Sequence, residues 1–368
     1  MAHFPTVGVI GAGQLARMMI APAVALGVKL RVFAQSESDS AAIDADFTIG
    51  NYSSAEEVLA FAQQCDVLTF EHELIPQSVI TELERNGITV RPRSSTFIFS
   101  QNKAELRKKL AEKNLPSPRW QLSSSPLELS YPFIAKAISG GYDGRGVWEI
   151  KNELDLSNIG ERELLLEEKL EFTCEVAVMV ARSPHGQIST WPVTETIQSA
   201  GICVKTITPA PSLSDELHQR AQKLAMEIAD LVGLVGVMAV EMFLVNGDLI
   251  INELAMRPHN SGHWTIEGAT TSQFEQHLRA VLDLPLGDTS MRAPIVVMGN
   301  VLGGAKTDMY RPYLHLFARS PHVKIHQYRK DVKPGRKVGH VTAWGNNLNS
   351  LLEEVQHAVD YMNGVIDE

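Results

Sequence analysis

The chain of 368 residues has a net charge of −10, with 44% hydrophobic and 21% charged residues. This composition is typical of a globular protein with room for two or three domains, and the negative charge argues against broad binding to nucleic acid or membrane surfaces. The three cysteines have no CxxC spacing, and no apolar run approaches the roughly 18 residues that span a bilayer. We therefore expect a cytoplasmic protein without a signal peptide or zinc site.

The first ninety residues alternate strand and helix patterns. Strands are predicted at 7–10, 30–34, 67–70 and 88–91, and helices at 14–26, 55–64 and 77–86. This alternation predicts an α/β fold with a parallel sheet and crossover helices.

The rest of the chain begins with a predicted helix at 100–114 and a linker rich in Pro and Ser at 115–132. Strands follow at 133–139, 147–150, 163–170, 175–181 and 204–210, then a helix at 215–231, a hairpin and a helix at 272–283. The tail has strands at 295–298, 324–328 and 338–343 and a helix at 351–362. We predict three domains, at 1–98, 99–292 and 293–368.

The hairpin at 236–255 carries one carboxylate in each apolar strand, Glu241 and Glu253. A charge in a buried strand is costly unless it is paired or binds a metal. A two-residue turn, Asn246-Gly247, would set Glu241 opposite Asn252, whereas a three-residue turn would set it opposite Glu253. In the second register both carboxylates would be close enough to bind hard cations on a nucleotide's phosphates.

A polar cluster follows the hairpin within ten residues: Arg257, His259, Asn260 and His263. Such a cluster is unusual for a purely structural hairpin. His259 and His263 have i,i+4 spacing, but neither an HExxH pattern nor a third ligand accompanies them, which argues against a zinc site.

Two glycine-rich segments predict anion sites. Gly11-Ala12-Gly13 follows the first strand and opens a helix, which favours a small-substrate site over a bare turn or a nicotinamide cofactor, since no acid ends the second strand. The segment at 140–146 contains four glycines and Arg145, and could close over phosphates, although it lacks the GK[ST] of a P-loop. Lys136, in the preceding strand, needs an anionic partner.

Polar residues also end the strand at 67–70, where Glu71 and Glu73 are placed for a substrate beyond the carboxyl edge of the sheet. A cluster of cations in the tail, Lys330, Lys333, Arg336 and Lys337, is either a solvated face or a phosphate pocket. The chain shows no Ser-His-Asp elbow and no nucleophilic cysteine motif, so chemistry driven by metal and phosphate fits the sequence best.

The segments GAGQLARM, TFEHE, AKAISGGYDGRGV, VEMF, INELAMRPHNSGHWT, SQFEQHLRAVLDLPLG and PGRKVGH occur in this order. Together they resemble the N5-carboxyaminoimidazole ribonucleotide synthetase family over nearly the whole chain. The resemblance implies a three-part ATP-grasp fold: an N-terminal Rossmann-like domain, a central ATP-grasp domain and a small C-terminal α+β domain. It also implies that ATP and bicarbonate carboxylate 5-aminoimidazole ribonucleotide in purine biosynthesis through carboxyphosphate, with release of ADP and phosphate. Mg²⁺ (or Mn²⁺) would assist, and the protein would be a homodimer.

The resemblance also implies residue roles. The residues that it assigns to ATP are Lys103, Lys136, Gly141, Tyr142, Asp143, Gly144, Arg145, Gly146, Val147, Glu168, Lys169, Leu170, Glu171, Glu175, Asn252 and Glu253. Glu241 and Glu253 would bind the metal, and Arg257, His259 and Asn260 would bind bicarbonate or carboxyphosphate. Those that it assigns to the aminoimidazole nucleotide are Gln14, Leu15, Glu71 or Glu73, Tyr142, Asp143, Arg145, Lys330 and Arg336. We hypothesise that Asp143 accepts the proton of the attacking nitrogen, and we count Lys330 among the catalytic residues.

The sequence is also compatible in part with three other functions. A second ATP-grasp ligase of purine metabolism, formate-dependent glycinamide ribonucleotide transformylase, shares the glutamates but not the NSGHWT segment. A nicotinamide dehydrogenase would leave Glu241, Glu253 and the 140–146 segment without a role. A nucleotide-binding regulator would have lost catalytic activity, yet every obvious catalytic group is present in the sequence.

Overall fold

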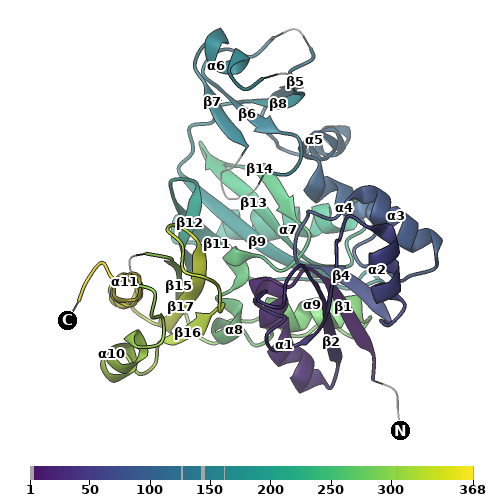
Figure 1. Ribbon diagram of the computed structural model, residues 1–368. Helices are drawn as coiled ribbons and strands as arrows, with labels where there is room; N and C mark the ends of the chain where they lie inside the picture. Colours follow the sequence, from purple (N-terminus) through teal and green to yellow (C-terminus); the bar gives the residue numbers. More distant parts are fainter. Residues whose placement is uncertain (1–3, 126, 142–145, 161, 305, 368) are drawn as a thin grey trace.

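The computed structural model describes residues 4–125, 127–141, 146–160, 162–304 and 306–367. In Figure 1 the C-terminal lobe lies to the left and the N-terminal lobe to the right, and the two contact each other where Lys330 donates to Gln14. A small sheet projects from the central lobe at the top of the same view. No helix in these described ranges is both long and apolar enough to cross a membrane.

The N-terminal lobe is a parallel sheet of order β3-β2-β1-β4. Most side chains of β2, β1 and β4 are buried, because helices cover both faces of the sheet. The bounds are β1 (Thr6–Ile10), α1 (Gln14–Leu26), β2 (Lys29–Ala34), β3 (Asp46–Ile49), α2 (Ala55–Ala62), β4 (Val67–Phe70), α3 (Gln77–Arg85) and α4 (Ser94–Gln101). The parallel sheet agrees with the sequence pattern, but the strand predicted at 88–91 contributes only a bridge between Leu68 and Val90. The edge strand β3 was not predicted, because it is mostly exposed.

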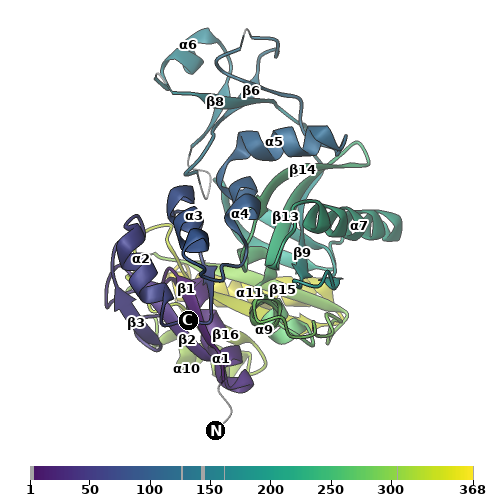
Figure 2. The same cartoon turned by 90° about the vertical axis from the view of Figure 1, so that its right-hand side faces the viewer.

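The projecting sheet has the order β5-β8-β6-β7 and its own small apolar core. Figure 2 shows it above α5, separated from the central sheet. The bounds are α5 (Lys103–Glu112), β5 (Trp120–Leu122), β6 (Phe133–Ala137), β7 (Val147–Ile150), α6 (Glu153–Ser157) and β8 (Leu164–Glu168). The helix predicted at 100–114 is present as α5, but it begins later than predicted: Asn102 ends α4, and its side chain caps α5 by accepting from the N–H groups of Ala104 and Glu105.

Nine strands of the described chain form one large sheet, of order β14-β13-β9-β11-β12-β15-β17-β16 with β10 beside β9. Its central-lobe bounds are β9 (Cys174–Arg182), β10 (Ile188–Thr190), β11 (Thr194–Ser199), β12 (Ile202–Thr208), α7 (Asp215–Leu231), β13 (Gly236–Val245), β14 (Asp248–Ala255), η1 (Asn260–Gly262), α8 (Thr265–Gly268) and α9 (Gln273–Val281). Nearly all side chains of β9 and of the first half of β13 are buried, so these two strands form the core of the large sheet.

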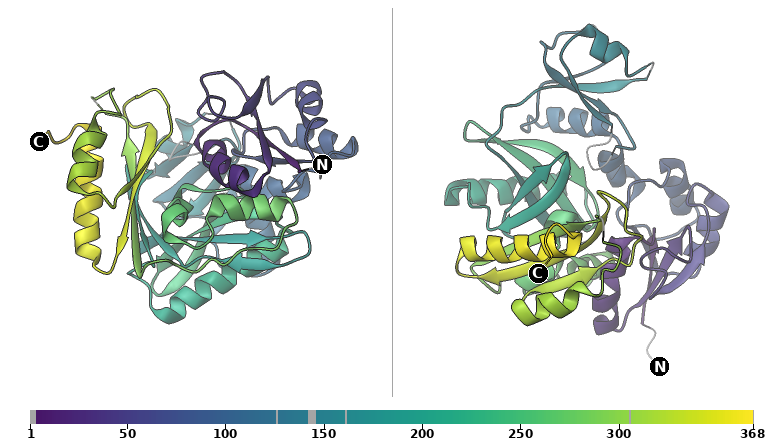
Figure 3. Two further views of the ribbon diagram at one scale, coloured as in Figure 1. Left: turned by 90° about the horizontal axis from the view of Figure 1, so that it is seen from below. Right: turned by 60° about the vertical axis from the view of Figure 1, so that its left-hand side comes forward.

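The C-terminal lobe continues this sheet rather than forming a separate one, since β12 pairs with β15. Its bounds are β15 (Ile295–Leu302), α10 (Pro312–Arg319), β16 (Lys324–Gln327), β17 (Lys337–Gly345) and α11 (Leu348–Asn363). The helix α11 lies along the outer side of β15 and β17 (Figure 3). The predicted domain limits at 98 and 292 stay predictions.

His277 joins the N-terminal lobe to the central sheet. Its fully buried ring accepts the N–H of Val237 at Nδ1 (3.1 Å), so Nε2 carries the hydrogen that bonds Thr69 Oγ1 (2.8 Å). Burial lowers the pKa of His277 to about 3. The neutral ring is thus part of the interface between the lobes.

Acid is predicted to destabilise the protein through His277. The unfolded chain binds a proton near pH 6.5, whereas the folded chain resists protonation down to about pH 3. This contribution to stability is therefore complete above pH 6.5 and falls by about 1.4 kcal/mol per pH unit below it. Urea unfolding at pH 7.5 and 5.5 should show a drop in unfolding free energy that is about 1.4 kcal/mol smaller in His277→Gln than in the wild type. Equal drops would contradict this assignment.

Candidate active site

The β13–β14 hairpin brings its two carboxylates face to face by a route that neither predicted register contains. The turn has two residues, Asn246 and Gly247, both with positive φ (51° and 88°), and Val245 pairs with Asp248. This turn alone would set Glu241 opposite Asn252. The register shifts between Met242 and Glu241, however, so Asn252 is an extra, bulged residue and Glu241 pairs with Glu253.

A buried ion cluster supports the bulge. Arg107 of α5 donates from Nη2 to the carbonyl of Asn252 (2.7 Å) and from Nε to Glu167 (2.6 Å). Lys136 of β6 contacts Glu167 (2.7 Å) and donates to the Asn252 side chain (2.9 Å). Burial alone would raise the pKa of Glu167, but Lys136 and Arg107 outweigh it and hold this pKa below its usual value. The cluster therefore fixes the ammonium group of Lys136 beside the hairpin.

The two facing carboxylates have different surroundings. Burial raises the pKa of Glu241, and the neighbouring charges of Glu253 and Glu175 add to the effect. Burial also disfavours the charged form of Glu253, but Lys103, whose Nζ lies 2.7 Å from Oε2, outweighs it, so the pKa of Glu253 is lowered. Glu241 contacts the ring of His259 instead (3.1 Å).

The carboxylate pair fits a hard divalent cation. The side chains of Glu241 and Glu253 are 22% and 40% exposed, so their oxygens can be reached from the site. Mg²⁺ takes one or two carboxylates and completes its shell with phosphate oxygens and water. Among the described residues, no group of three or more His, Cys, Asp or Glu side chains could hold a metal by itself. The donor set therefore suits a cation that arrives with a nucleotide.

The segment after β14 places three polar side chains beside the carboxylates. Nε of Arg257 lies 2.9 and 3.0 Å from the two carboxylate oxygens of Glu73, which follows β4. His259 contacts Glu241, and Asn260 forms a reciprocal amide pair with Asn300. The ion pair of Arg257 with Glu73 connects the central site with the N-terminal lobe.

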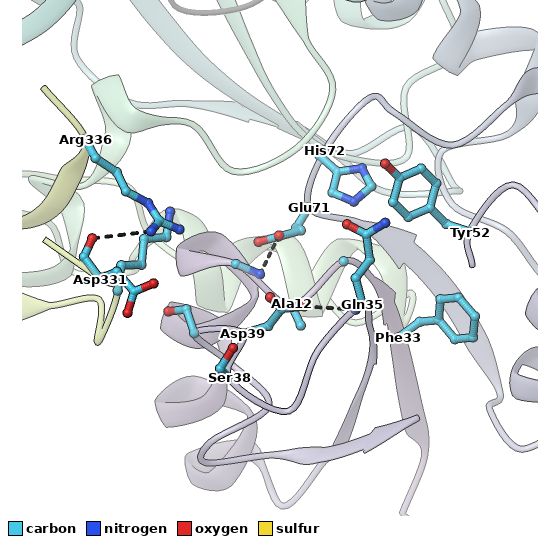
Figure 4. Close-up of a pocket in the computed structure, with 14 residues that line it drawn as sticks. Ala12, Phe33, Gln35, Ser38, Asp39, Tyr52, Glu71, His72, Asp331 and Arg336 are labelled. Atoms are coloured by element: carbon cyan, nitrogen blue, oxygen red, sulfur yellow. Dashed lines mark hydrogen bonds between the residues drawn. The ribbon is translucent and has the colours of Figure 1, made fainter. Parts of the chain in front are cut away.

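A polar cavity of about 220 Å³ opens at the carboxyl edge of the N-terminal sheet. Its wall includes the Gly11–Gly13 turn, Tyr52, Glu71 and His72, and Lys330 and Arg336 of the C-terminal lobe also line it. Figure 4 shows Arg336 and Asp331 approaching from one side, with Glu71, His72 and Tyr52 on the other. The cavity therefore combines cationic side chains with an aromatic wall.

The predicted anion at the start of α1 is the protein's own Glu71. Its carboxylate accepts the N–H groups of Gly13 and Ala16. A Cβ on Gly13 would lie 2.5 Å from Glu71 Oε1, so only glycine permits this approach. Gln14 accepts a hydrogen bond from Lys330, and Leu15 is buried in the lobe's core. Glu71, and not Glu73, thus lines the cavity.

The other described residues predicted for ATP lie in or next to the projecting sheet, except Glu175, which lies in β9. Glu168 accepts from Arg119, Lys169 pairs with Glu149 (2.9 Å), and burial raises the pKa of Glu175. Gly141, Gly146 and Val147 flank residues 142–145, and Leu170 and Glu171 follow β8. Tyr142, Asp143, Gly144 and Arg145 lie outside the described residues.

Sequence reasoning missed the supporting residues Arg107, Glu167, Gln273 and Asn300. All four are at most 2% exposed, and each contacts a predicted site residue or its backbone. The one available signal was an ionisable or amide group within an apolar stretch, as for Glu167 in LLLEE.

Comparison with known proteins identifies the class. Residues 4–101 match the model of the ribonucleotide synthetase preATP-grasp domain, and residues 108–274 match the ATP-grasp domain. Residues 296–354 match the phosphoribosylaminoimidazole carboxylase C-terminal domain. With the facing carboxylates and neighbouring lysines, these matches define an ATP-grasp enzyme, which is an ATP-dependent ligase.

Individual relatives narrow the class to a family. N5-carboxyaminoimidazole ribonucleotide synthase of Mycobacterium tuberculosis is 43% identical over 377 residues, covering 98% of this chain and 88% of the relative. A structure of the Staphylococcus aureus synthetase with ADP has a TM-score of 0.88 at 30% identity, covering 97% of this chain and 98% of that one. The Aspergillus clavatus synthase with ADP and 5-aminoimidazole ribonucleotide also has a TM-score of 0.88 at 30% identity, covering 99% of this chain and 100% of that one. The chain belongs to the N5-carboxyaminoimidazole ribonucleotide synthase family.

Removing the Arg107 guanidinium is predicted to destabilise the protein strongly. Arg107→Met leaves the carbonyl of Asn252 and one oxygen of Glu167 without their partner in a buried site, at a cost of about 3 kcal/mol. The matched control is Lys108→Met on the same helix, which removes only an exposed ion pair and should leave stability nearly unchanged. Chemical unfolding measures both variants, and equal losses would disprove the structural role of the cluster.

Proposed function

We infer that this protein carboxylates 5-aminoimidazole ribonucleotide with bicarbonate and ATP in purine biosynthesis, releasing ADP and phosphate. The carrying observation is the facing pair Glu241 and Glu253, which lies beside Lys103 and is joined by His259 to the Arg257–Asn260 segment. Phosphate-binding groups and groups suited to a small anion thus share one site.

ATP is proposed to bind between the projecting sheet and the hairpin, where Lys136 of β6 reaches the side chain of Asn252. Lys103 and Lys136 would contact its phosphates, and Glu241 and Glu253 would hold Mg²⁺ with Asn252 nearby. When bound, Mg²⁺ supplies charge neutralisation for phosphoryl transfer. In the structure Lys103 contacts the carboxylate of Glu253. This contact suggests that, when ATP binds, Lys103 leaves Glu253 and contacts an ATP phosphate instead.

Bicarbonate is a poor electrophile, so its activation must come first. A bicarbonate oxygen attacks the γ-phosphorus, the bond to ADP breaks, and carboxyphosphate forms. Arg257, His259 and Asn260 would bind this anion and stabilise its charge. The nucleotide's amine then attacks the carboxyl carbon, phosphate leaves, and the nitrogen loses a proton, for which Asp143 is the proposed acceptor.

The cavity at the N-terminal lobe is the proposed site for 5-aminoimidazole ribonucleotide. Lys330 and Arg336 would bind the 5′-phosphate as cationic donors, while Glu71 and the Gly11–Gly13 turn form the opposite wall. Glu73 would act indirectly, since its carboxylate holds Arg257. The carboxylate of Glu71 at the start of α1 also argues against a nicotinamide dehydrogenase, because it would repel a pyrophosphate at that position.

We further propose that the protein is a cytoplasmic homodimer, as the family resemblance implies. Light scattering of the purified protein would measure its mass directly. A mass near that of one chain, 40.5 kDa, would contradict the dimer.

The function is tested by measuring ADP release with ATP and Mg²⁺, with and without bicarbonate and 5-aminoimidazole ribonucleotide. ADP release should require Mg²⁺ and bicarbonate and be strongly stimulated by the nucleotide. ADP release that is indifferent to both co-substrates would contradict the proposal and require a different acid and acceptor.

The nucleotide site has its own test in Arg336→Met. Loss of one phosphate contact should raise the KM for the nucleotide about tenfold, while the KM for ATP stays within about twofold. The matched control is Lys324→Met, an exposed cation on β16 that does not line the cavity. If both variants keep the wild-type KM, Arg336 does not bind the nucleotide.

A further inference from the structure

Two fully or almost fully buried amides hold the segment that carries His259 and Asn260. The first is Gln273, at the start of α9. Its Oε1 accepts the backbone N–H of His259 (2.8 Å), and its Nε2 donates to the carbonyl of the same residue (2.8 Å). The Gln273 side chain thus makes the same two hydrogen bonds to the backbone of His259 that a neighbouring strand would make. Because the backbone of His259 is held in this way, its ring is placed so that Nε2 contacts Glu241.

The second amide is Asn300 of β15, which is 1% exposed. Its Nδ2 donates to Asn260 Oδ1 (2.7 Å) and to the carbonyl of Cys203 (2.9 Å), while its Oδ1 accepts from Asn260 Nδ2 (2.8 Å). Both hydrogens of Asn300 Nδ2 are therefore used. Rotating this amide by half a turn would set its oxygen against two acceptors, so its orientation is fixed.

The fixed orientation of Asn300 is passed on to Asn260. The pair uses one N–H and one lone pair of the Asn260 amide and leaves one of each. Because Asn260 cannot rotate without losing both hydrogen bonds, the direction of its remaining N–H is determined by a residue of the C-terminal lobe.

We propose that Asn300 and Gln273 are positioning residues for the acid substrate: Asn300 directs the free N–H of Asn260, and Gln273 holds His259, toward bicarbonate and the carboxyphosphate formed from it. This proposal rests on the function proposed above. A small anion that is held only weakly needs donors at fixed positions, and a misplaced donor would let the activated intermediate reach water before the amine attacks it.

The test compares Asn300→Leu with the wild type and with Thr342→Val. The control is another change from polar to apolar at a buried position, on β17 beside β15. We expect Asn300→Leu to raise the KM for bicarbonate about tenfold or more and to raise the ratio of ADP to carboxylated product above the wild-type value. The KM for ATP should stay within about twofold, and Thr342→Val should change none of these quantities.

A merely structural role for Asn300 would lower the melting temperature and leave the bicarbonate KM and the ADP-to-product ratio of the folded enzyme unchanged, which would overturn the proposal.

If Asn300→Leu does not fold, Asn300→Ser decides, since its hydroxyl keeps one polar partner for Asn260 and should give a smaller change in the same two quantities. Gln273→Glu, which replaces the donor to the His259 carbonyl by a carboxylate oxygen, should act in the same direction. A wild-type enzyme whose ADP release ignores bicarbonate would refute the proposed function instead, and thereby separate the two claims.

Discussion

One extra residue in a β-hairpin determines the geometry of the site. The two-residue turn at Asn246-Gly247 sets a register in which Glu241 would face Asn252, and the bulge at Asn252 restores the pairing with Glu253. The bulge exposes a backbone carbonyl that must find a partner in a buried region, and Arg107 supplies it. The facing carboxylates, the position of Lys136 and the fixed side chain of Asn252 all depend on this arrangement.

The same principle extends to the rest of the site, where buried polar groups hold the groups that would touch the reactants. Arg107 and Glu167 hold Lys136, Glu73 holds Arg257, and Gln273 and Asn300 hold the segment of His259 and Asn260. Such groups are costly to bury unless every hydrogen bond is made, so they contribute geometry more than net stability. These supporting residues come from all three lobes. The geometry of the site therefore depends on how the three lobes pack against one another.

Local patterns in the sequence predict much of this structure. The helices at 14–26 and 215–231 agree with the observed bounds, as does the hairpin with its two glutamates, because periodicity, caps and turn residues act over a few positions. The bulge was beyond such reasoning, because Arg107 stabilises it from 145 positions away. The role of Glu71 at the start of α1 was also hidden, since a helix N-terminus indicates that an anion is favoured but not whether it is a ligand or a side chain of the protein.

The central claim, that the site transfers a phosphoryl group to bicarbonate, is tested most directly with bicarbonate labelled with ¹⁸O in all its oxygens. Attack on the γ-phosphorus places a bicarbonate oxygen between carbon and phosphorus, and the later loss of phosphate breaks the carbon–oxygen bond. Mass spectrometry of the inorganic phosphate should therefore find one ¹⁸O atom per turnover. Unlabelled phosphate would show that ATP is cleaved by water and that carboxyphosphate is not formed.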